Sequence, residues 1–323
     1  MQRSTIAACV IARDEERFIG GCLESLAPFV DEMVLVDTGS LDRTRDIAQA
    51  LGARVQTFAW CDDFAAARNA AIETATADWI FMLDADERLE ADSGVVLRDL
   101  PRRMPIGVHG ACPRIESRTL TEASGPCSIT SEVPRFFRRS ADLRYTGAIH
   151  EDLVFLPDPA ATRNVIVHDL RVIHYGYDSA LYAARHKDER NTRLLERQTA
   201  EHPHDPRPLY FLTQQHYVME RYAEAVACGR RFLALSQSVR EAFVVETYAM
   251  LLHALAELDR PAEVHATADI AAAANLLGVA AYEALARFEE RRGRLRQAVE
   301  YLHRARDLEL PAGLTSKVPA GWA

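Results

Sequence analysis

The chain has 323 residues, of which 48% are hydrophobic and 26% charged, and its formal net charge is −9 at pH 7. This length predicts about two domains, and this composition excludes a disordered or fibrous protein. The negative charge disfavours broad binding to nucleic acid or to an anionic membrane. No apolar run approaches the roughly 18 residues of a membrane-spanning helix, and no secretory leader pattern begins the chain. We therefore expect a cytoplasmic protein without a nucleic-acid partner.

The six cysteines are scattered along the chain and form no CxxC pair. This spacing matches neither a zinc site nor a disulfide framework. None lies beside a histidine in a context typical of a catalytic thiol. We expect small buried side chains in a reducing compartment. The residues are Cys9, Cys22, Cys61, Cys112, Cys127 and Cys228.

The first part of the chain alternates short apolar runs with segments of helical spacing. The apolar runs predict buried strands at 5–12, 33–36, 54–58 and 79–83, and the segments between them predict helices at 18–26, 42–51 and 64–75. Asp42 is a suitable N-cap for the second helix. Strand–helix alternation of this kind predicts a parallel sheet with right-handed crossovers.

From about residue 105 the pattern changes to separate strands with irregular connections, at 107–115, 134–137, 149–155 and 165–175. Helical spacing returns at Ser179 and continues to about His202. The prolines between His202 and Pro208 cannot continue a helix, so this segment predicts a linker. We expect the domain boundary there.

Beyond Pro208 the chain is helical and repeats itself. Tyr210, Tyr248 and Tyr282 each introduce a pair of helices, and their separations of 38 and 34 residues are typical of tetratricopeptide-type repeats. A bundle with chance periodicity is the alternative, because the middle copy is degenerate. The predicted order is a first domain over 1–202 with a helical extension from about 179, repeats over 208–310 and a tail over 311–323.

Polar clusters follow three of the predicted strands, at 13–15, 37–40 and 84–87. In an open parallel sheet, ligands bind at these strand ends. Asp84 and Asp86 point the same way if the strand geometry continues, and two such carboxylates suit a divalent cation that neutralises a diphosphate. An acidic turn is the alternative. The chain has neither GxGxxG after the first strand nor GxxxxGK[ST], so dinucleotide and P-loop sites lose their main support.

Four ordered motifs carry a resemblance to a known family: VIARDEE at 10–16, VLVDTGSLDRT at 34–44, WxDDFxxxRN at 60–69 and LDADE at 83–87. Together they resemble the family 2 glycosyltransferases, although Asp14 replaces the asparagine of the usual NEE start. The resemblance covers about residues 4–180. It implies an α/β domain with the GT-A fold, a Rossmann-like sheet, followed by an all-α tetratricopeptide-like domain. Bacterial enzymes of this organisation include peptide S-glycosyltransferases, which modify a cysteine of a bacteriocin-type peptide.

The resemblance implies a nucleotide-sugar donor, usually a UDP-sugar. Carried over by position, Asp37 would contact the uracil or ribose, Arg68 would lie at the nucleotide, and Asp84 would face the ribose or a metal. Glu16 falls at the acidic position after the first strand. The residues by themselves also allow plainer roles: Asp37 begins a turn, Arg68 is a surface arginine, and Glu16 belongs to a solvated helix start.

The resemblance also implies a divalent metal, Mn²⁺ or Mg²⁺, with Asp86 as a direct ligand that connects it to the diphosphate. His174, at the end of an apolar run, would be a second ligand. A packed structural histidine is the alternative. His150 and His168 are weaker candidates for a role in the site.

The segment Tyr145–Leu153 resembles the part of the family that carries the catalytic base of inverting transfer. Such a base removes the nucleophile's proton while the acceptor attacks the anomeric carbon opposite the leaving diphosphate. Glu151 and Asp152 both qualify, only one of them faces the site in a strand, and we favour Glu151. Ordinary strand-edge carboxylates are the alternative. Three nearby arginines either hold phosphate or line a solvated strand edge: Arg135, Arg138 and Arg139.

These expectations combine into a metal-dependent inverting glycosyltransferase. It would move a sugar to a nucleophilic side chain of a peptide or protein, with a cysteine thiol among the candidates. The repeats would bind the peptide or form a homodimer. The alternatives are transfer to a lipid, polysaccharide or small molecule, a non-catalytic interaction scaffold, and a nucleotidyltransferase.

Overall fold

The computed structural model describes residues 3–117, 127–128, 133–175, 187–239 and 241–308. The chain forms two compact units, residues 1–185 and 186–323. This division precedes the predicted linker at 202–208, because helix α6 (Lys187–Glu201) packs on α7 (Pro206–Val218) of the second unit. Gln215 of α7 donates a hydrogen bond to Asp188 of α6 over 2.9 Å. The predicted helix start at Ser179 and the tail at 311–323 lie outside the described residues.

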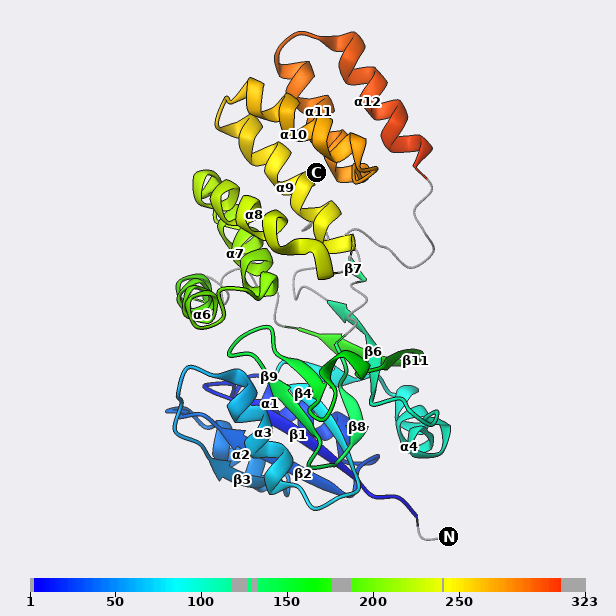
Figure 1. Cartoon of the computed structure of the whole chain (residues 1–323). Helices are drawn as coiled ribbons and strands as arrows, with labels where there is room; N and C mark the ends of the chain where they lie inside the picture. The colour runs from blue at the N-terminus through cyan, green and yellow to red at the C-terminus, as the bar shows by residue number, and fades with distance from the viewer. Residues whose placement is uncertain (1–2, 118–126, 129–132, 176–186, 240, 309–323) are drawn as a thin grey trace. The chain divides into compact units, whose positions relative to one another are not determined.

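Four parallel strands form one half of the sheet in the first unit (Figure 1). Across the sheet they are β3 (Arg54–Thr57), β2 (Glu32–Asp37), β1 (Ile6–Ala12) and β4 (Trp79–Asp84). The helices between them in sequence are α1 (Ile19–Leu26), α2 (Thr44–Ala50) and α3 (Phe64–Thr74). The predicted strand–helix alternation and parallel sheet are therefore confirmed. Helix α2 begins two residues after Asp42, whose carboxylate accepts the N–H of Thr44 at 2.9 Å.

The other half of the sheet is mixed and joins strands far apart in the sequence. Beyond β4 come β8 (Phe136–Arg138), β6 (Gly110–Ser117), β11 (Asn164–His174) and β5 (Glu87–Leu89), and β7 (Cys127–Ser128) also pairs with β6. Strands β6 and β11 are parallel, whereas the other pairs in this half are antiparallel.

Smaller elements complete the description of the first unit. Strands β9 (Leu143–Thr146) and β10 (Asp152–Phe155) form a separate hairpin, and a 3-10 turn spans Pro159–Ala161. Helix α4 covers Ser93–Arg103. The sequence predicts β6, β8, β10 and β11 approximately, but it does not predict β5, β7, β9 or α4. Each of the unpredicted strands has four residues or fewer, which is too short to display a clear two-residue period.

Both faces of the sheet are covered, so β1 is apolar along its whole length. Ile6, Ala8 and Val10 belong to a core that α1, α2 and α4 help to line. Ala7 and Cys9 belong to a second core, lined by α3 and the β9–β10 hairpin. This alternation follows from the two-residue period of a strand. The layered packing fixes the strand ends and therefore the polar residues that follow them.

The cysteines agree only in part with the prediction of buried thiols. Cys9, Cys22 and Cys112 are buried, and Cys228 is partly buried. The prediction is wrong for Cys61, which is exposed because it lies in the loop between β3 and α3. The side chain of Cys127 lies outside the described set.

The second unit consists of paired helices. The pairs are α7 with α8 (Tyr222–Leu235), α9 (Glu241–Glu257) with α10 (Pro261–Ala273), and α11 (Val279–Arg291) with α12 (Leu295–Asp307). A 3-10 turn spans Ser236–Ser238. Tyr210, Tyr248 and Tyr282 each lie in the first helix of a pair, as predicted. Among the helices of the described ranges, none is long and apolar enough to cross a membrane.

The turn inside each helix pair has the same backbone form. Its left-handed residue has a φ angle of 57°, 50° and 74° at Glu220, Asp259 and Gly293, a conformation that ends many helices. The next residue is an arginine in every pair, and its N–H donates to the carbonyl five residues earlier: Arg221 to His216, Arg260 to Leu255 and Arg294 to Glu289. The internal repeat therefore includes the turn, which the tyrosine spacing does not reveal.

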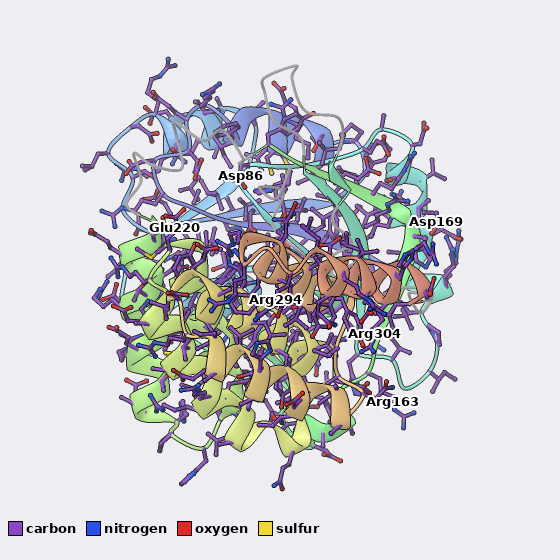
Figure 2. The ribbon with its side chains drawn as sticks, turned by 90° about the horizontal axis from the view of Figure 1, so that it is seen from above. Asp86, Arg163, Asp169, Glu220, Arg294 and Arg304 are labelled. Atoms are coloured by element: carbon purple, nitrogen blue, oxygen red, sulfur yellow. The ribbon has the colours of Figure 1, made fainter. Side chains whose placement is uncertain are left out.

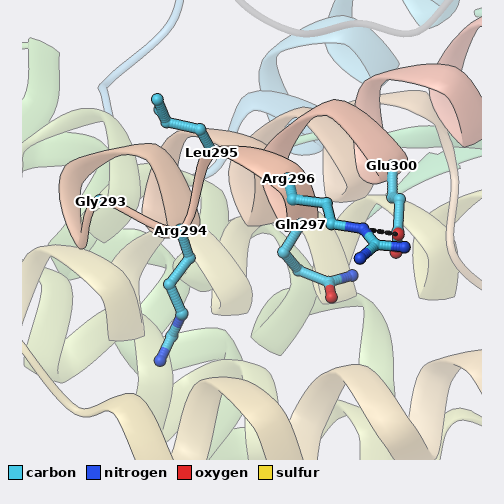
Figure 3. Close-up of a pocket in the computed structure, with 6 residues that line it drawn as sticks. All are labelled: Gly293, Arg294, Leu295, Arg296, Gln297 and Glu300. Atoms are coloured by element: carbon cyan, nitrogen blue, oxygen red, sulfur yellow. Dashed lines mark ion pairs between the residues drawn. The ribbon is translucent and has the colours of Figure 1, made fainter.

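A shallow hollow lies at the third of these turns (Figure 3). Its lining comes from one turn and the helix that follows it: Gly293, Arg294, Leu295, Arg296, Gln297 and Glu300. Arg296 and Glu300 form an ion pair of 3.7 Å across one helical turn, and Arg294 binds the buried Glu289. The charged groups of the hollow thus have protein partners, as on an ordinary solvated helix surface.

Candidate active site

The loops that follow β1 and β2 are bound to each other at the carboxyl edge of the sheet. The N–H of Asp14 donates to Ser40 Oγ over 2.9 Å, and the N–H of Leu41 donates to Asp14 Oδ1 over 2.7 Å. Glu16 is exposed, and its carboxylate accepts the N–H of Arg43 at 3.1 Å. Glu16 therefore helps to join the two loops at the edge where the sequence predicts a ligand.

Asp37 ends β2 and is buried, with 1% of its surface exposed. Its carboxylate accepts the N–H groups of Gly39 and Ser40, each at 3.2 Å. Gly39 has a φ angle of 109°, which an L side chain would strain. Arg45 Nε lies 4.0 Å from Asp37 Oδ2. Asp37 thus closes the DTGS turn, the plainer of its two predicted roles, and it does so at the predicted edge.

Arg68 connects three of the sequence motifs. It lies in α3, whose N-cap Asp63 accepts the N–H of Ala66 at 2.9 Å. Its Nη2 donates to Asp84 Oδ1 over 2.7 Å, and its Nε donates to the carboxylate of Glu151. Only 6% of Arg68 is exposed, so the role of a surface arginine is excluded. Its buried Nη1 has no hydrogen-bond partner among the residues that the structure describes.

Asp84 receives a second guanidinium from Arg135. Arg135 Nη2 donates to Asp84 Oδ2 over 2.9 Å and to Glu87 Oε1 over 3.0 Å. Burial alone would raise the pKa of Asp84, but Arg135 and Arg68 outweigh it and hold that pKa well below its usual range. Burial raises the pKa of Glu87, and the neighbouring Asp84 adds to this while Arg135 opposes it. Asp84 therefore stays ionised between two arginines.

Arg135 differs from the two arginines that follow it. Its exposed fraction is 7%, whereas Arg138 and Arg139 are exposed. The solvated strand edge considered for all three is therefore wrong for Arg135. Sequence reasoning also missed Glu87, which is 3% exposed. The only available signal was that Glu87 is the third acidic residue of the DADE segment.

Asp86 and His174 lie together at the end of β4 (Asp86 is labelled in Figure 2). Strand β5 pairs antiparallel with β11 so that Glu87 is opposite His174. Asp86 Oδ2 is then 3.4 Å from His174 Nε2, and the N–H of Tyr175 donates to the Asp86 carbonyl over 2.9 Å. Burial alone would lower the pKa of His174, but the hydrogen bond to Asp86 raises it above its ordinary value.

The chemistry of this pair fits a divalent cation that is shared with a ligand. A carboxylate oxygen and an imidazole nitrogen are suitable metal donors, and Mg²⁺ in particular is held by one or two carboxylates plus substrate phosphates. Within the described ranges, no group of three or more His, Cys, Asp or Glu side chains could hold a metal ion by itself. The remaining positions around a cation would therefore belong to water and to the ligand.

The two predicted base residues have different surroundings. Glu151 follows His150, which has a φ angle of 52°, and its side chain is 11% exposed beside Arg68. Asp152 begins β10 and pairs with Thr146 of β9. The structure thus brings Glu151 into the cluster with Arg68 and Asp84. His168 is exposed in the irregular part of β11, between Val167 and Arg171.

Residues 7–146 match the family model described as Glycosyl transferase family 2. Residues 7–146 form a family 2 glycosyltransferase domain. Two relatives extend the match, a TPR repeat-containing protein of Synechococcus elongatus and the SPbeta prophage-derived glycosyltransferase SunS of Bacillus subtilis. The first is 36% identical over 209 residues, which are 62% of this chain and 49% of the relative. The second is 27% identical over 224 residues, which are 69% and 51%. The chain spans about half the length of each of these relatives.

Part of the chain is also similar to proteins of known structure. One is glucosyl-3-phosphoglycerate synthase from Mycobacterium tuberculosis in complex with Mn²⁺ and UDP-glucose, with 23% identity and a TM-score of 0.30 over 35% of this chain and 44% of that one. The family match and the observed sheet confirm the predicted class, an α/β glycosyltransferase domain followed by paired helices. The family 2 resemblance of the four motifs is confirmed with it.

Proposed function

We propose that this chain transfers a sugar from a UDP-sugar to a nucleophilic side chain of a peptide or protein, with inversion at the anomeric carbon. The observation that carries this proposal is the convergence of Arg68, Asp84 and Glu151 at the carboxyl edge of the sheet. Buried charged groups add little to stability by themselves. They are concentrated at functional sites, where their chemistry is needed.

Two features support an anionic nucleotide donor at this edge. Arg68 Nη1 is buried and lacks a hydrogen-bond partner within the described part of the chain, and such donors are rare unless a ligand, an ion or an ordered water satisfies them. Asp37 lies at the end of the neighbouring strand β2, close to Arg45. In this proposal Arg68 donates to the nucleotide, and the turn at Asp37 contacts the uracil or ribose.

Asp86 and His174 would hold Mn²⁺ or Mg²⁺ together with the donor's diphosphate. When bound, the cation supplies positive charge that stabilises the diphosphate as it leaves. Asp84 lies beside Asp86 and faces the ribose or the cation. The protein's own contribution is to hold these oxygens on rigid strand ends, so that the anomeric carbon has a fixed position.

Glu151 would act as the base, with Asp152 as the other candidate. The acceptor atom forms a bond to the anomeric carbon, the bond to the diphosphate oxygen breaks, and the carboxylate takes the acceptor's proton. Arg68 holds Glu151 Oε1 and so orients the carboxylate. Such a base can remove the proton from a thiol or a hydroxyl group of the acceptor.

The acceptor proposal rests on two observations of different kinds. Bacterial family 2 enzymes with this two-domain organisation include peptide S-glycosyltransferases. The paired helices of the second unit are also of the type whose stacked repeats present concave binding surfaces. The proposal also includes a homodimer through these repeats. With a lipid, polysaccharide or small-molecule acceptor, the chemistry at the sugar donor would be the same and only the second substrate would differ.

Nucleotide release is the direct test of the donor proposal. The full chain is incubated with a panel of nucleotide sugars and Mn²⁺, with and without EDTA, and free nucleotide is measured. We expect metal-dependent release from a UDP-sugar that Asp86→Ala abolishes, while Asp92→Ala, in the loop before α4, is the matched control. No release and no binding of any nucleotide sugar would refute the transferase proposal and favour the scaffold.

The acceptor needs its own experiment. Peptides that contain a single Cys, Ser or Thr are incubated with the donor found above, and a mass increase of one sugar is sought. Lipid and oligosaccharide acceptors are tested in parallel. A mass shift on peptides alone supports the proposal, whereas a shift on lipid or oligosaccharide alone contradicts it.

A further inference from the structure

Four residues at the end of β4 form a turn that is closed by side chains. Glu87 Oε2 accepts the backbone N–H of Asp84 at 2.9 Å. Glu87 Oε1 accepts from Arg135 Nη2, and the same nitrogen donates to Asp84 Oδ2. Three contacts therefore make a closed ring around the turn, with Asp86 as the acidic residue that the ring leaves out.

The backbone of Arg135 is hydrogen-bonded to a strand on each side. Its N–H donates to the carbonyl of Ala111 in β6 over 3.0 Å, and its carbonyl accepts the N–H of Met82 in β4 at 2.8 Å. The guanidinium therefore starts from a fixed backbone between two strands. The guanidinium binds the carboxylates of Asp84 and Glu87, and only 7% of the residue is exposed.

Glu87 connects this ring to His174. Its backbone is opposite His174 in the β5–β11 ladder, while its side chain holds the N–H of Asp84. The position of Asp86 is thus set from both sides, by the ring on one side and by the ladder that carries His174 on the other.

We propose that Arg135 and Glu87 are positioning residues that hold the turn 84–87 in the form in which Asp86 meets the cation and the donor's diphosphate. This inference rests on the proposed function. Neither residue touches the donor in this proposal. Partners of this indirect kind commonly change metal affinity by about 10–100-fold when they are removed.

The test measures Mn²⁺ affinity and does not depend on turnover. Mn²⁺ binding to the full chain at saturating UDP is followed by the EPR signal of free Mn²⁺, at a temperature well below unfolding. We expect about tenfold weaker Mn²⁺ binding for Glu87→Gln and for Arg135→Met. Arg135→Lys keeps the charge with a shorter reach, so its affinity should lie between those of Arg135→Met and the unchanged protein.

Arg98→Met is the matched control. Arg98 makes two hydrogen bonds to Asp31, at 2.6 and 2.9 Å, ahead of the start of β2 and so at the opposite edge of the sheet. Its loss removes a comparable ion pair and should leave Mn²⁺ affinity within twofold. Thermal unfolding without metal is recorded for each variant, and if Arg135→Met is unfolded, Glu87→Gln and Arg135→Lys decide the question.

The outcomes separate the two proposals. Folded variants that bind Mn²⁺ within twofold of the unchanged protein would overturn the positioning role alone. An equal loss of UDP affinity in EDTA would make Arg135 a direct phosphate ligand and would also overturn it. If the unchanged protein binds no Mn²⁺ in the presence of UDP, the metal proposal itself fails and this inference fails with it.

Discussion

Arg68 Nη2 lies 2.7 Å from Asp84 Oδ1, so helix α3 and the end of β4 are joined by an ion pair inside the glycosyltransferase domain. Arg135 holds the other oxygen of Asp84, and Arg68 also binds Glu151. The positive charges of the two guanidinium groups nearly neutralise the negative charges of the carboxylates around them. Several acidic side chains can therefore lie together at one edge of the sheet. Asp86 is outside this balanced set and faces His174 instead.

Removal of Arg68 should destabilise the fold as well as the site. Arg68→Met leaves the carboxylates of Asp84 and Glu151 without this partner, and breaking a buried pair in this way costs about 3 kcal/mol or more. The free energy of unfolding is measured by urea titration of the full chain with tryptophan fluorescence, since Trp60 and Trp79 lie in the first unit.

Two companion variants make this prediction specific. Arg68→Met combined with Glu151→Gln should recover part of the lost free energy of unfolding, because Glu151→Gln removes one of the two carboxylate charges that lack a partner in Arg68→Met. Arg45→Met is the control, since Arg45 is 46% exposed and its distance to Asp37 is 4.0 Å, and it should change the free energy by less than about 1 kcal/mol. Equal losses for Arg45→Met and Arg68→Met would contradict the importance of the buried pair.

The parallel half of the domain was predictable because its signals are local. Each strand of β1, β2 and β4 is a short apolar run that ends in polar residues, so Asp37 and Asp84 were placed at one edge without any knowledge of tertiary contacts. Arg68 was placed there only through the family resemblance, because its own pattern suits an ordinary helix surface.

The mixed half was not predictable in the same way. Arg135 meets Asp84 because β8 pairs with β4 across more than fifty residues of sequence, and no local period encodes that pairing. The three residues of β5 are too few to be recognised as a strand, yet this strand brings Glu87 opposite His174. Glu87 was therefore missed, and Arg135, although a candidate for binding phosphate, was not recognised as the partner of Asp84 and Glu87.

Two adjacent glycines in α1 should respond differently to alanine. A Cβ on Gly21 would lie 2.4 Å from Arg88 Cζ, so the guanidinium, now 4.7 Å from the centroid of the Tyr175 ring, must move. A Cβ on Gly20 would meet only Ile47 Cγ2, at 3.5 Å. Alanine favours a helix over glycine by up to about 1 kcal/mol. We expect Gly20→Ala to stabilise, and Gly21→Ala to lose that gain through the displaced cation–π contact, which is worth about 1 kcal/mol.

Thermal unfolding of the two variants checks this expectation. The melting temperature should rise for Gly20→Ala and stay level or fall for Gly21→Ala. Equal increases for both would mean that Arg88 moves without loss and that its contact with Tyr175 contributes nothing.

Mn²⁺ binding should depend strongly on the nucleotide. In the proposed site Asp86 and His174 would provide one oxygen and one nitrogen, and the described residues contain no group of three His, Cys, Asp or Glu side chains that could hold a metal ion by itself. Isothermal titration should therefore give at least tenfold tighter Mn²⁺ binding with UDP than without it, since the diphosphate completes the coordination. Tight binding of Mn²⁺ to the protein alone would contradict a shared site.

The helical unit should lose stability in mild acid through His253 of α9. Burial and the charges of Arg291 and Arg287 lower the pKa of His253 to about 4, although Glu257, whose Oε1 lies 3.3 Å from Nε2, opposes this. The rings of Tyr217 and Tyr222 also pack against the His253 ring. The unfolded chain binds the proton near pH 6.5 and the folded chain only near pH 4.

Stability from this histidine is therefore complete above about pH 6.5 and is lost as the pH falls towards 4. Between pH 7.5 and 5 the loss should be about 2 kcal/mol. Circular dichroism at 222 nm would follow thermal unfolding across this range for the unchanged protein and for His253→Gln, whose side chain takes no proton. We expect a shallower pH dependence for His253→Gln than for His265→Gln, a control at a histidine that is 45% exposed. Identical slopes for these two variants would show that folding does not change the pKa of His253.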